Sequence, residues 1–195
     1  VGCESAREIV DAMTARMQDP QAGFDTFRLS AATITGGSAA VAVVVTGREV
    51  GACEHRLLGG VFTAEPQHHM LCRWGLDDVG PFMSTDSVAV MEHGVALSRR
   101  TFKDFLAELD WSVDDVDRTI CHQVGSGHRE VILRELGLDS AGDFVTYDKL
   151  GNTGSCALPV SLAMAQEEGF LRAGQRVGLL GIGSGLNCLM LGVQW

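Results

Sequence analysis

The chain has 195 residues, of which 46% are hydrophobic and 21% are charged, a composition typical of a globular domain rather than a disordered segment. Its 15 basic and 25 acidic residues give a formal net charge of −10. This charge argues against a nucleic-acid partner, because phosphate binding needs clustered cations. No apolar run reaches the roughly 18 residues that a membrane-spanning helix needs. The first six residues read as the end of a strand rather than a signal peptide, and without an initiating Met the sequence is compatible with a fragment.

Neither the basic residues nor the cysteines form an obvious ligand site. Arg99, Arg100 and Lys103 are a tight basic cluster, which we interpret as a solvated helix face rather than an anion site. The cysteines lack C-x-x-C spacing, and several lie in apolar or Gly-rich runs, as buried free thiols do: Cys3, Cys53, Cys72, Cys121, Cys156 and Cys188. We therefore expect a reduced, cytoplasmic protein with no metal and no other cofactor.

The first part of the chain contains one predicted helix and two predicted strands. Residues 4–18 are expected to be helical because apolar side chains recur at four-residue spacing before Pro20. Residues 39–45 are an almost continuous apolar run, which is typical of a strand covered on both faces. A second strand is expected near residues 55–62. Residues 66–81 lose the pattern and are predicted to be a loop.

A long helix is predicted to begin after Thr85, which is an N-cap candidate. Its apolar positions follow at helical spacing, so one face is expected to pack on a sheet. These positions are Val88, Met91, Val95, Phe102, Phe105 and Leu109.

The remainder of the chain alternates between strand and helix. This alternation indicates an α/β protein with helices on the faces of a sheet. The expected strands or extended segments are residues 119–122, 144–147, 176–181 and 186–193, and the expected helices are residues 129–136 and 157–168.

Two polar motifs lie at the ends of these elements. His122 directly follows the apolar Ile120 and Cys121, and taken alone it is more often a hydrogen-bonded core histidine than a functional one. Asn152 follows Gly151 just before a predicted helix, and taken alone it reads as a turn with an N-cap.

A glycine-rich segment at residues 181–187 is the third motif. A dinucleotide-binding glycine motif has to follow a strand and open a helix, but residues 186–195 lack a helical period and contain Gly192. The sequence therefore argues against Rossmann binding and predicts a tight turn between two strands. Glycines in such a turn let a backbone N–H approach a ligand closely.

In this order and spacing, the three motifs resemble the C-terminal half of beta-ketoacyl-ACP synthase III and its thiolase-superfamily relatives. In that family a His-Gln motif, a Gly-Asn motif and a terminal Gly-rich hairpin line one active site. The resemblance also covers residues 33–40, and so runs over essentially the whole chain. It implies a thiolase-like, layered α-β-α-β-α architecture. Residues 1–47 would then be the end of the N-terminal half, and residues 48–195 the C-terminal half.

Within the superfamily, the amino-acid sequence of residues 122–124, 150–152 and 181–187 is most similar to the OleA type. Enzymes of this type join two long-chain fatty acyl-CoA molecules head to head, in pathways to olefins or β-lactones. The resemblance thus implies an acyltransferase that performs a non-decarboxylative Claisen condensation. Two alternatives stay open: decarboxylative condensation with malonyl-ACP, as in the initiating synthases, and a non-catalytic partner subunit of a condensing enzyme.

The resemblance also assigns roles to individual residues. His122 and Asn152 would supply side-chain N–H donors to the thioester carbonyl that becomes the enolate, and the Ser184 backbone N–H would belong to the oxyanion hole. A neutral imidazole can donate in this way without a charge. The flanking glycines are expected to contact the substrate: Gly151, Gly183 and Gly185.

The nucleophilic cysteine of the family matches none of the residues present. Cys3 falls on the strand that follows the nucleophile's helix, while Cys121 and Cys156 match core positions. The glutamate thought to take the α-proton in the OleA type also belongs to the missing half. The implied partners are a fatty acyl-CoA or acyl-ACP substrate and a Cys-bearing N-terminal half or companion chain, in a homodimer or heteromer.

Overall fold

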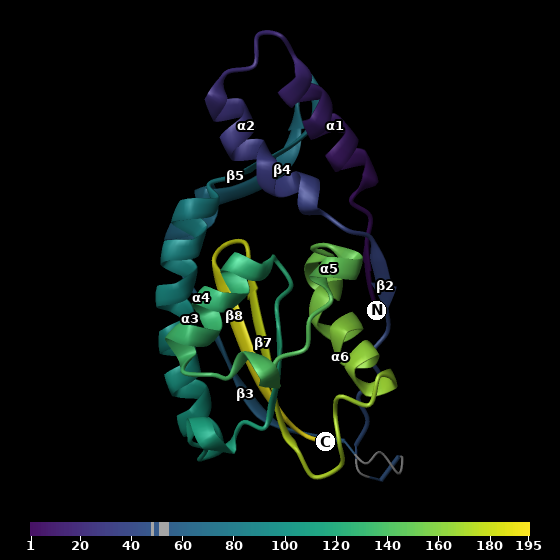
Figure 1. The fold of residues 1–195 in the computed structure, drawn as a ribbon, viewed down its shortest axis with the longest axis vertical. Coiled ribbons are helices and arrows are strands. Elements are labelled where there is room, and N and C mark those ends of the chain that lie inside the picture. Colours follow the sequence, from purple (N-terminus) through teal and green to yellow (C-terminus); the bar gives the residue numbers. More distant parts are fainter. Residues whose placement is uncertain (48, 51–54) are drawn as a thin grey trace.

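The computed structural model describes residues 1–47, 49–50 and 55–195. The strands are β1 (Gly2–Glu4), β2 (Ala39–Val41), β3 (Arg56–Ala64), β4 (Cys72–Asp77), β5 (Gly80–Thr85), β6 (Arg118–Cys121), β7 (Arg176–Gly183) and β8 (Asn187–Gln194). The helices are α1 (Arg7–Gln18), α2 (Phe24–Ser30), α3 (Ser87–Leu109), α4 (Ser126–Leu136), α5 (Tyr147–Leu150) and α6 (Ala157–Glu167). The predicted alternation is only partly correct, because β6 is followed by three successive helices, α4 to α6, and then by β7 and β8; the chain still mixes helices and strands as an α/β protein does (Figure 1).

A four-stranded sheet in the order β3-β8-β7-β6 is the centre of the molecule. Strands β6 and β7 run parallel, whereas β7, β8 and β3 are antiparallel neighbours. The chain segments that leave the C-terminal ends of β6 and β7 therefore emerge at the same edge of the sheet. These segments contain His122 and the glycine-rich turn.

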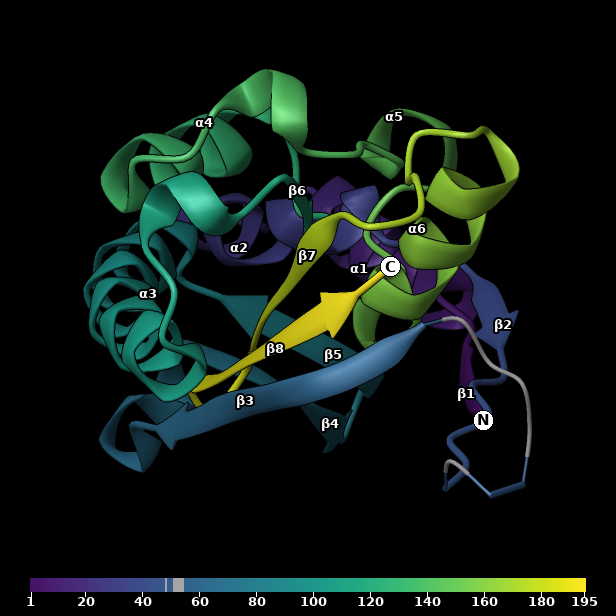
Figure 2. The ribbon, with the colours of Figure 1, turned by 90° about the horizontal axis from the view of Figure 1, so that it is seen from below.

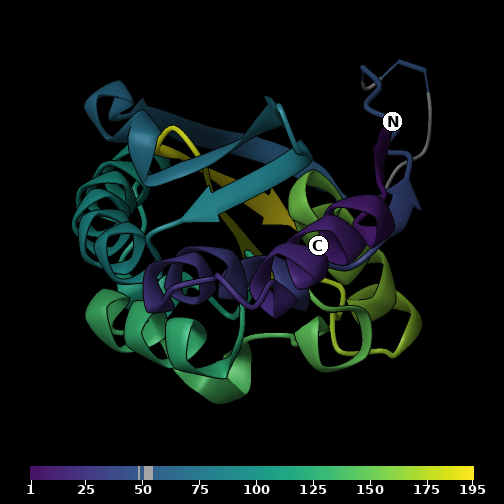
Figure 3. The ribbon, with the colours of Figure 1, turned by 90° about the horizontal axis from the view of Figure 1, so that it is seen from above.

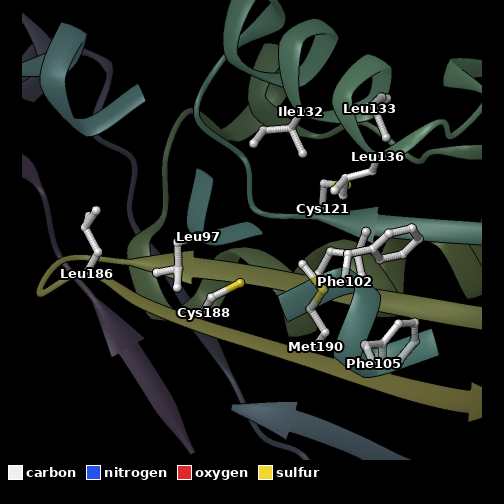
Figure 4. Packing of buried hydrophobic residues seen from close by; sticks show 11 residues of the cluster. Leu97, Phe102, Phe105, Cys121, Ile132, Leu133, Leu136, Leu186, Cys188 and Met190 are labelled. Carbon is white, nitrogen blue, oxygen red and sulfur yellow. The ribbon is translucent and has the colours of Figure 1, made fainter. Parts of the chain in front are cut away.

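Helices cover both faces of this sheet, with α3 and α4 on one face and α6 on the other (Figure 2). Because side chains alternate along a strand, neighbouring residues enter different cores. Cys121 packs with α3 and α4, and the adjacent Ile120 packs in the cluster on the α6 side. Figure 4 shows the first cluster, in which Ile132, Leu133 and Leu136 of α4 face Cys121 and Met190. This packing fixes β6 directly before His122.

The elements α1, α2, β4 and β5 form the far end of the molecule (Figures 1 and 3). Both helices pack against β5. The Arg16 guanidinium of α1 binds the Asp77 carboxylate at 2.6 Å and lowers the pKa of that carboxyl group to about 2. This ion pair links α1 to the β4–β5 hairpin.

The structure contradicts the predicted loop at residues 66–81. Residues Pro66–Leu71 form a 3₁₀ helix, and β4 and β5 then form an antiparallel hairpin. The long helix also begins one residue later than predicted. Thr85 ends β5, while the Asp86 carboxylate caps α3 by accepting from the Ala89 N–H.

The predicted strand at residues 39–45 is shorter than expected. Only Ala39–Val41 pair, with Glu4, Cys3 and Gly2 of β1, because the three residues of β1 offer no further partner. Val43, Val44 and Val45 are exposed rather than covered on both faces.

The other expected elements are confirmed within one to three residues at each end, apart from residues 144–147. No strand forms there, because residues 144–146 belong to no helix or strand and Tyr147 begins α5. The glycine-rich turn joins two antiparallel strands, which confirms the rejection of a dinucleotide-binding motif. Cys53 lies outside the described residues.

Candidate active site

His122 continues the line of β6 at its C-terminal end. Its backbone N–H donates to the Leu180 carbonyl of β7 at 3.0 Å, so the residue is held beside the strand that leads into the glycine-rich turn. The side chain lines a small cavity of about 20 Å³ between α4 and the sheet. Other lining residues are His128, Ile132, Gly181, Ile182 and Met190.

The His122 imidazole is neutral at physiological pH. Burial, and to a smaller extent the proximity of His128, together lower its pKa to about 4. Burial also lowers the pKa of His128. A neutral imidazole carries one N–H donor and one acceptor nitrogen, so His122 is suited to donate a hydrogen bond to an oxygen that gains negative charge.

Cys121 is unsuited to nucleophilic attack. Burial raises the pKa of its thiol well above the usual value, and the nearby Asp143 carboxylate adds to this effect. Because the thiolate is the reactive form, the thiol remains protonated and inert. Cys156 is also fully buried, and its Sγ lies 3.5 Å from the Ala39 carbonyl.

Asn152 is held in place through its backbone and its side-chain oxygen. Its N–H donates to the Thr35 carbonyl at 2.8 Å, and its carbonyl accepts from the Gly37 N–H at 2.8 Å. Its Oδ1 accepts from the Gly154 N–H at 3.0 Å. With Oδ1 engaged, the Nδ2 group is left to donate to a ligand.

Ser184 lies in the turn between β7 and β8. Its carbonyl accepts from the Asn187 side-chain amide at 2.7 Å. Its own N–H has no hydrogen-bond partner within the part of the chain that the structure describes. This backbone donor is therefore available to a ligand, as an oxyanion-hole group has to be.

The three predicted substrate-binding glycines differ in their surroundings. Gly151 has φ +67°, and a Cβ there would lie 2.6 Å from the Thr35 carbonyl, so only glycine fits. Gly185 has φ +131°. A Cβ at Gly183 would meet nothing within 4 Å, which leaves open space beside the turn.

No hydrogen bond joins the side chains of His122, Asn152 and Ser184 to one another among the described residues. The link between the His122 and Asn152 segments is Gln123, which is 1% exposed. Its side-chain oxygen accepts from the N–H groups of Thr146 and Tyr147, directly before and at the start of α5. The resemblance placed Gln123 in the His-Gln motif but gave its side chain no role, and this motif was the signal that pointed to it.

The predicted basic cluster lies on an exposed face of α3. The Arg99 guanidinium is 3.6 Å from the Glu135 carboxylate, and Arg100 contacts Glu65. These acidic neighbours agree with the interpretation as a solvated helix face.

Comparison with known families identifies the C-terminal part of the chain. Residues 106–195 match the family model described as the 3-oxoacyl-[acyl-carrier-protein] synthase III C-terminal domain. The last 90 residues of the chain are therefore similar to this C-terminal domain. The domain contains His122, Asn152 and the glycine-rich turn, and so the whole candidate site.

Similarity to individual proteins extends over the whole chain. The acyl-CoA:acyl-CoA alkyltransferase of Shewanella oneidensis is 48% identical over 100% of the chain and 58% of its own length. A crystal structure of Xanthomonas campestris OleA with bound lauric acid and lauroyl-CoA is 30% identical, with a TM-score of 0.87 over 99% of the chain and 56% of that protein. The Xanthomonas oryzae synthase III, FabH, is also 30% identical, with a TM-score of 0.85 over 99% and 56%.

These comparisons confirm the thiolase-like fold of condensing enzymes. The chain spans less than two thirds of the length of each of these relatives. Among the described residues, no helix is both long enough and apolar enough to cross a membrane.

Proposed function

We propose that this chain is the C-terminal half of an acyl-CoA condensing enzyme and supplies the donors for a non-decarboxylative Claisen condensation of two long-chain fatty acyl-CoA molecules. The proposal is supported by the identity of 48% to an acyl-CoA:acyl-CoA alkyltransferase over the full length of the chain. The nucleophilic cysteine is contributed by the N-terminal half, which is either part of a longer chain or a companion polypeptide. Residues 1–47 complete that half, and residues 48–195 form the C-terminal half.

The reaction needs hydrogen-bond donors at two oxygens. One acyl group is held as a cysteine thioester, and the α-carbon of the second acyl thioester attacks its carbonyl carbon after losing a proton to a base outside this chain. The carbon–carbon bond forms, and the cysteine leaves as a thiolate. Negative charge develops first on the enolate oxygen and then on the attacked carbonyl oxygen.

His122 and Asn152 donate to the enolate oxygen in this proposal, and the Ser184 N–H donates to the second oxygen. Each donor can lower the barrier by roughly 3–4 kcal/mol, the range for removal of an oxyanion-hole group. The observation that carries these roles is the state of the two side chains. His122 is kept neutral by burial, and Asn152 has its oxygen occupied by the Gly154 N–H.

The substrate class is tested by combining this chain with the Cys-bearing polypeptide and supplying lauroyl-CoA alone. We expect a β-keto product and free CoA without release of carbon dioxide. Lauroyl-CoA is chosen because it is bound in the structure of the similar OleA. Failure to form product from any acyl-CoA, with turnover of malonyl-ACP, would contradict the proposal.

The match to the synthase III domain and to FabH supports a second candidate function. In that case the enolate arises by decarboxylation of malonyl-ACP, and carbon dioxide is released in proportion to product. The same two donors would serve, so substrate profiling rather than mutation of His122 separates the two functions. A third candidate, a non-catalytic partner subunit, predicts full activity of the assembly when both His122 and Asn152 are replaced.

A further inference from the structure

Gln123 occupies a buried position between two segments of the candidate site. It directly follows His122, and its side chain points toward the chain segment that opens α5. Helix α5 is four residues long and ends at Leu150, directly before Gly151 and Asn152. The amide of Gln123 therefore lies between the end of β6, next to His122, and the start of α5, which leads to Asn152.

Every hydrogen-bonding group of the Gln123 side chain is used. Nε2 donates to the Cys121 carbonyl at 2.7 Å and to the Phe144 carbonyl at 3.3 Å. Oε1 accepts from the Thr146 N–H at 2.9 Å and from the Tyr147 N–H at 3.2 Å. An amide offers two donors and one oxygen with two acceptor sites, so no other residue of this size could make the same four bonds.

A second set of contacts holds the other side of the Asn152 segment. The Thr35 carbonyl and the Gly37 N–H bind the Asn152 backbone. Gly37 also packs closely, because a Cβ there would lie 1.8 Å from the Leu150 carbonyl. The position of Asn152 relative to His122 thus depends on two supports, and Gln123 is the one that joins it to the His122 segment.

We propose that Gln123 is a positioning residue that sets the spacing between the His122 and Asn152 donors. This inference rests on the proposed function, in which both donors converge on one thioester oxygen. Donors on one developing charge act only from nearly fixed positions, and a displacement of about 1 Å can cost about 100-fold in rate.

The test uses Gln123→Met in the assembly that contains the Cys-bearing polypeptide, because Met keeps the length of the side chain and removes all four hydrogen bonds. Two rates are measured: transfer of the acyl group to the cysteine, and formation of the β-keto product. We expect condensation to fall by about 10- to 100-fold, with little change in acyl transfer. Amide hydrogen exchange at Thr146 and Tyr147 should become faster.

Thr119→Val is the matched control. It removes another buried hydrogen bond between β6 and the segment before α5, from the Thr119 hydroxyl to the Asp143 carboxylate at 2.9 Å. That bond lies farther from both donors along the chain, so Thr119→Val should lower stability without changing the ratio of the two rates. An equal fall of both rates in Gln123→Met, or the same rate ratio in the two variants, would show a purely structural role and overturn the inference.

Gln123→Glu provides a second variant if Gln123→Met does not fold. A protonated carboxyl group can replace one donor and accept at its carbonyl oxygen, so condensation should fall less than in Gln123→Met, and unchanged condensation relative to acyl transfer would again overturn the inference. His122→Ala is measured in parallel. If its condensation is intact, the proposed function fails; if only the Gln123 variants keep the normal rate ratio, the inference alone fails.

Discussion

Different physical effects suit His122 and Asn152 to their proposed roles as donors. Burial makes the charged imidazole costly, which lowers the His122 pKa to about 4 and leaves a neutral ring with one N–H. Asn152 is oriented by a hydrogen bond, because its Oδ1 accepts from the Gly154 N–H. The neutral state of His122 and the orientation of Asn152 are both set before substrate binds, so little reorganisation is needed during reaction.

The low pKa of His122 can be measured directly by NMR titration of its imidazole resonances. We expect no titration between pH 8 and pH 5.5, and a midpoint near 4. His128→Gln should raise this midpoint slightly, because His128 is the smaller of the two causes. A midpoint near the unperturbed value of about 6.5 would show that the ring is solvated.

The same shift makes the folding stability depend on pH. Below pH 6.5 the unfolded chain binds a proton at His122, whereas the folded chain does so only near pH 4. Above pH 6.5 the His122 shift therefore leaves the free energy of unfolding unchanged. As the pH falls from 6.5 toward 4, it lowers the free energy of unfolding by at most roughly 3 kcal/mol.

The elements around the site depend on close backbone packing that single residues can disturb. Gly37→Ala should push the Leu150 carbonyl away, because the added Cβ would lie 1.8 Å from it. We expect a loss of about 1–3 kcal/mol in the free energy of unfolding and altered amide chemical shifts at Asn152. Gly127→Ala in α4 is the control, since a Cβ there meets nothing within 4 Å, and it should be neutral or stabilising by up to about 1 kcal/mol. Equal stability of the two variants would contradict the packing described.

The sequence predicted those elements whose signal is local. Residues 4–18 contain α1 and residues 157–168 contain α6, because a helical period and a terminating Pro or Gly can be read from neighbouring residues. The β4–β5 hairpin was missed because Gly75 interrupts β4 and because the apolar side chains of Trp74 and Leu76 in that strand face solvent. The strand at residues 39–45 was overestimated, because its length depends on a partner strand and not on its own composition.

Only part of the candidate site could be predicted from local sequence signals. The positions of His122 and Asn152 at the ends of elements were predictable, as was the glycine-rich turn. The four hydrogen bonds of Gln123 were not, because they join residues 121–123 to residues 144–147 through the tertiary fold.

The molecule as a whole exposes apolar side chains that the proposed assembly with the Cys-bearing polypeptide could bury. Val44 is 85% exposed beyond the end of β2, and Trp74 is 82% exposed on β4. The exposed side chains of Val43, Val44 and Val45 are consecutive, and contiguous exposed apolar surface commonly marks an interface. If the proposed Cys-bearing polypeptide covers residues 43–45, it would extend the β1–β2 sheet beyond the three residues that pair within this chain.

Hydrogen exchange tests this proposal. The amides of residues 43–45 should exchange rapidly in the isolated chain and become protected when the Cys-bearing polypeptide is added, because they would then pair in a larger sheet. Residues 177–180 of β7 are the internal control, since they pair with β6 on one side and β8 on the other and should stay protected throughout. Unchanged rapid exchange at residues 43–45 in an active assembly would contradict a shared sheet.

The proposed roles of His122 and Asn152 are tested most directly by measuring the rates of acyl transfer and of condensation separately in the complete assembly. In the proposed mechanism, His122→Ala and Asn152→Ala each remove one donor from the enolate oxygen and leave the cysteine untouched. We predict that acyl-enzyme forms at nearly the normal rate in both variants, while β-keto product formation falls by about 100- to 1,000-fold. Product formation at the normal rate in both variants would contradict the assignment of these two residues.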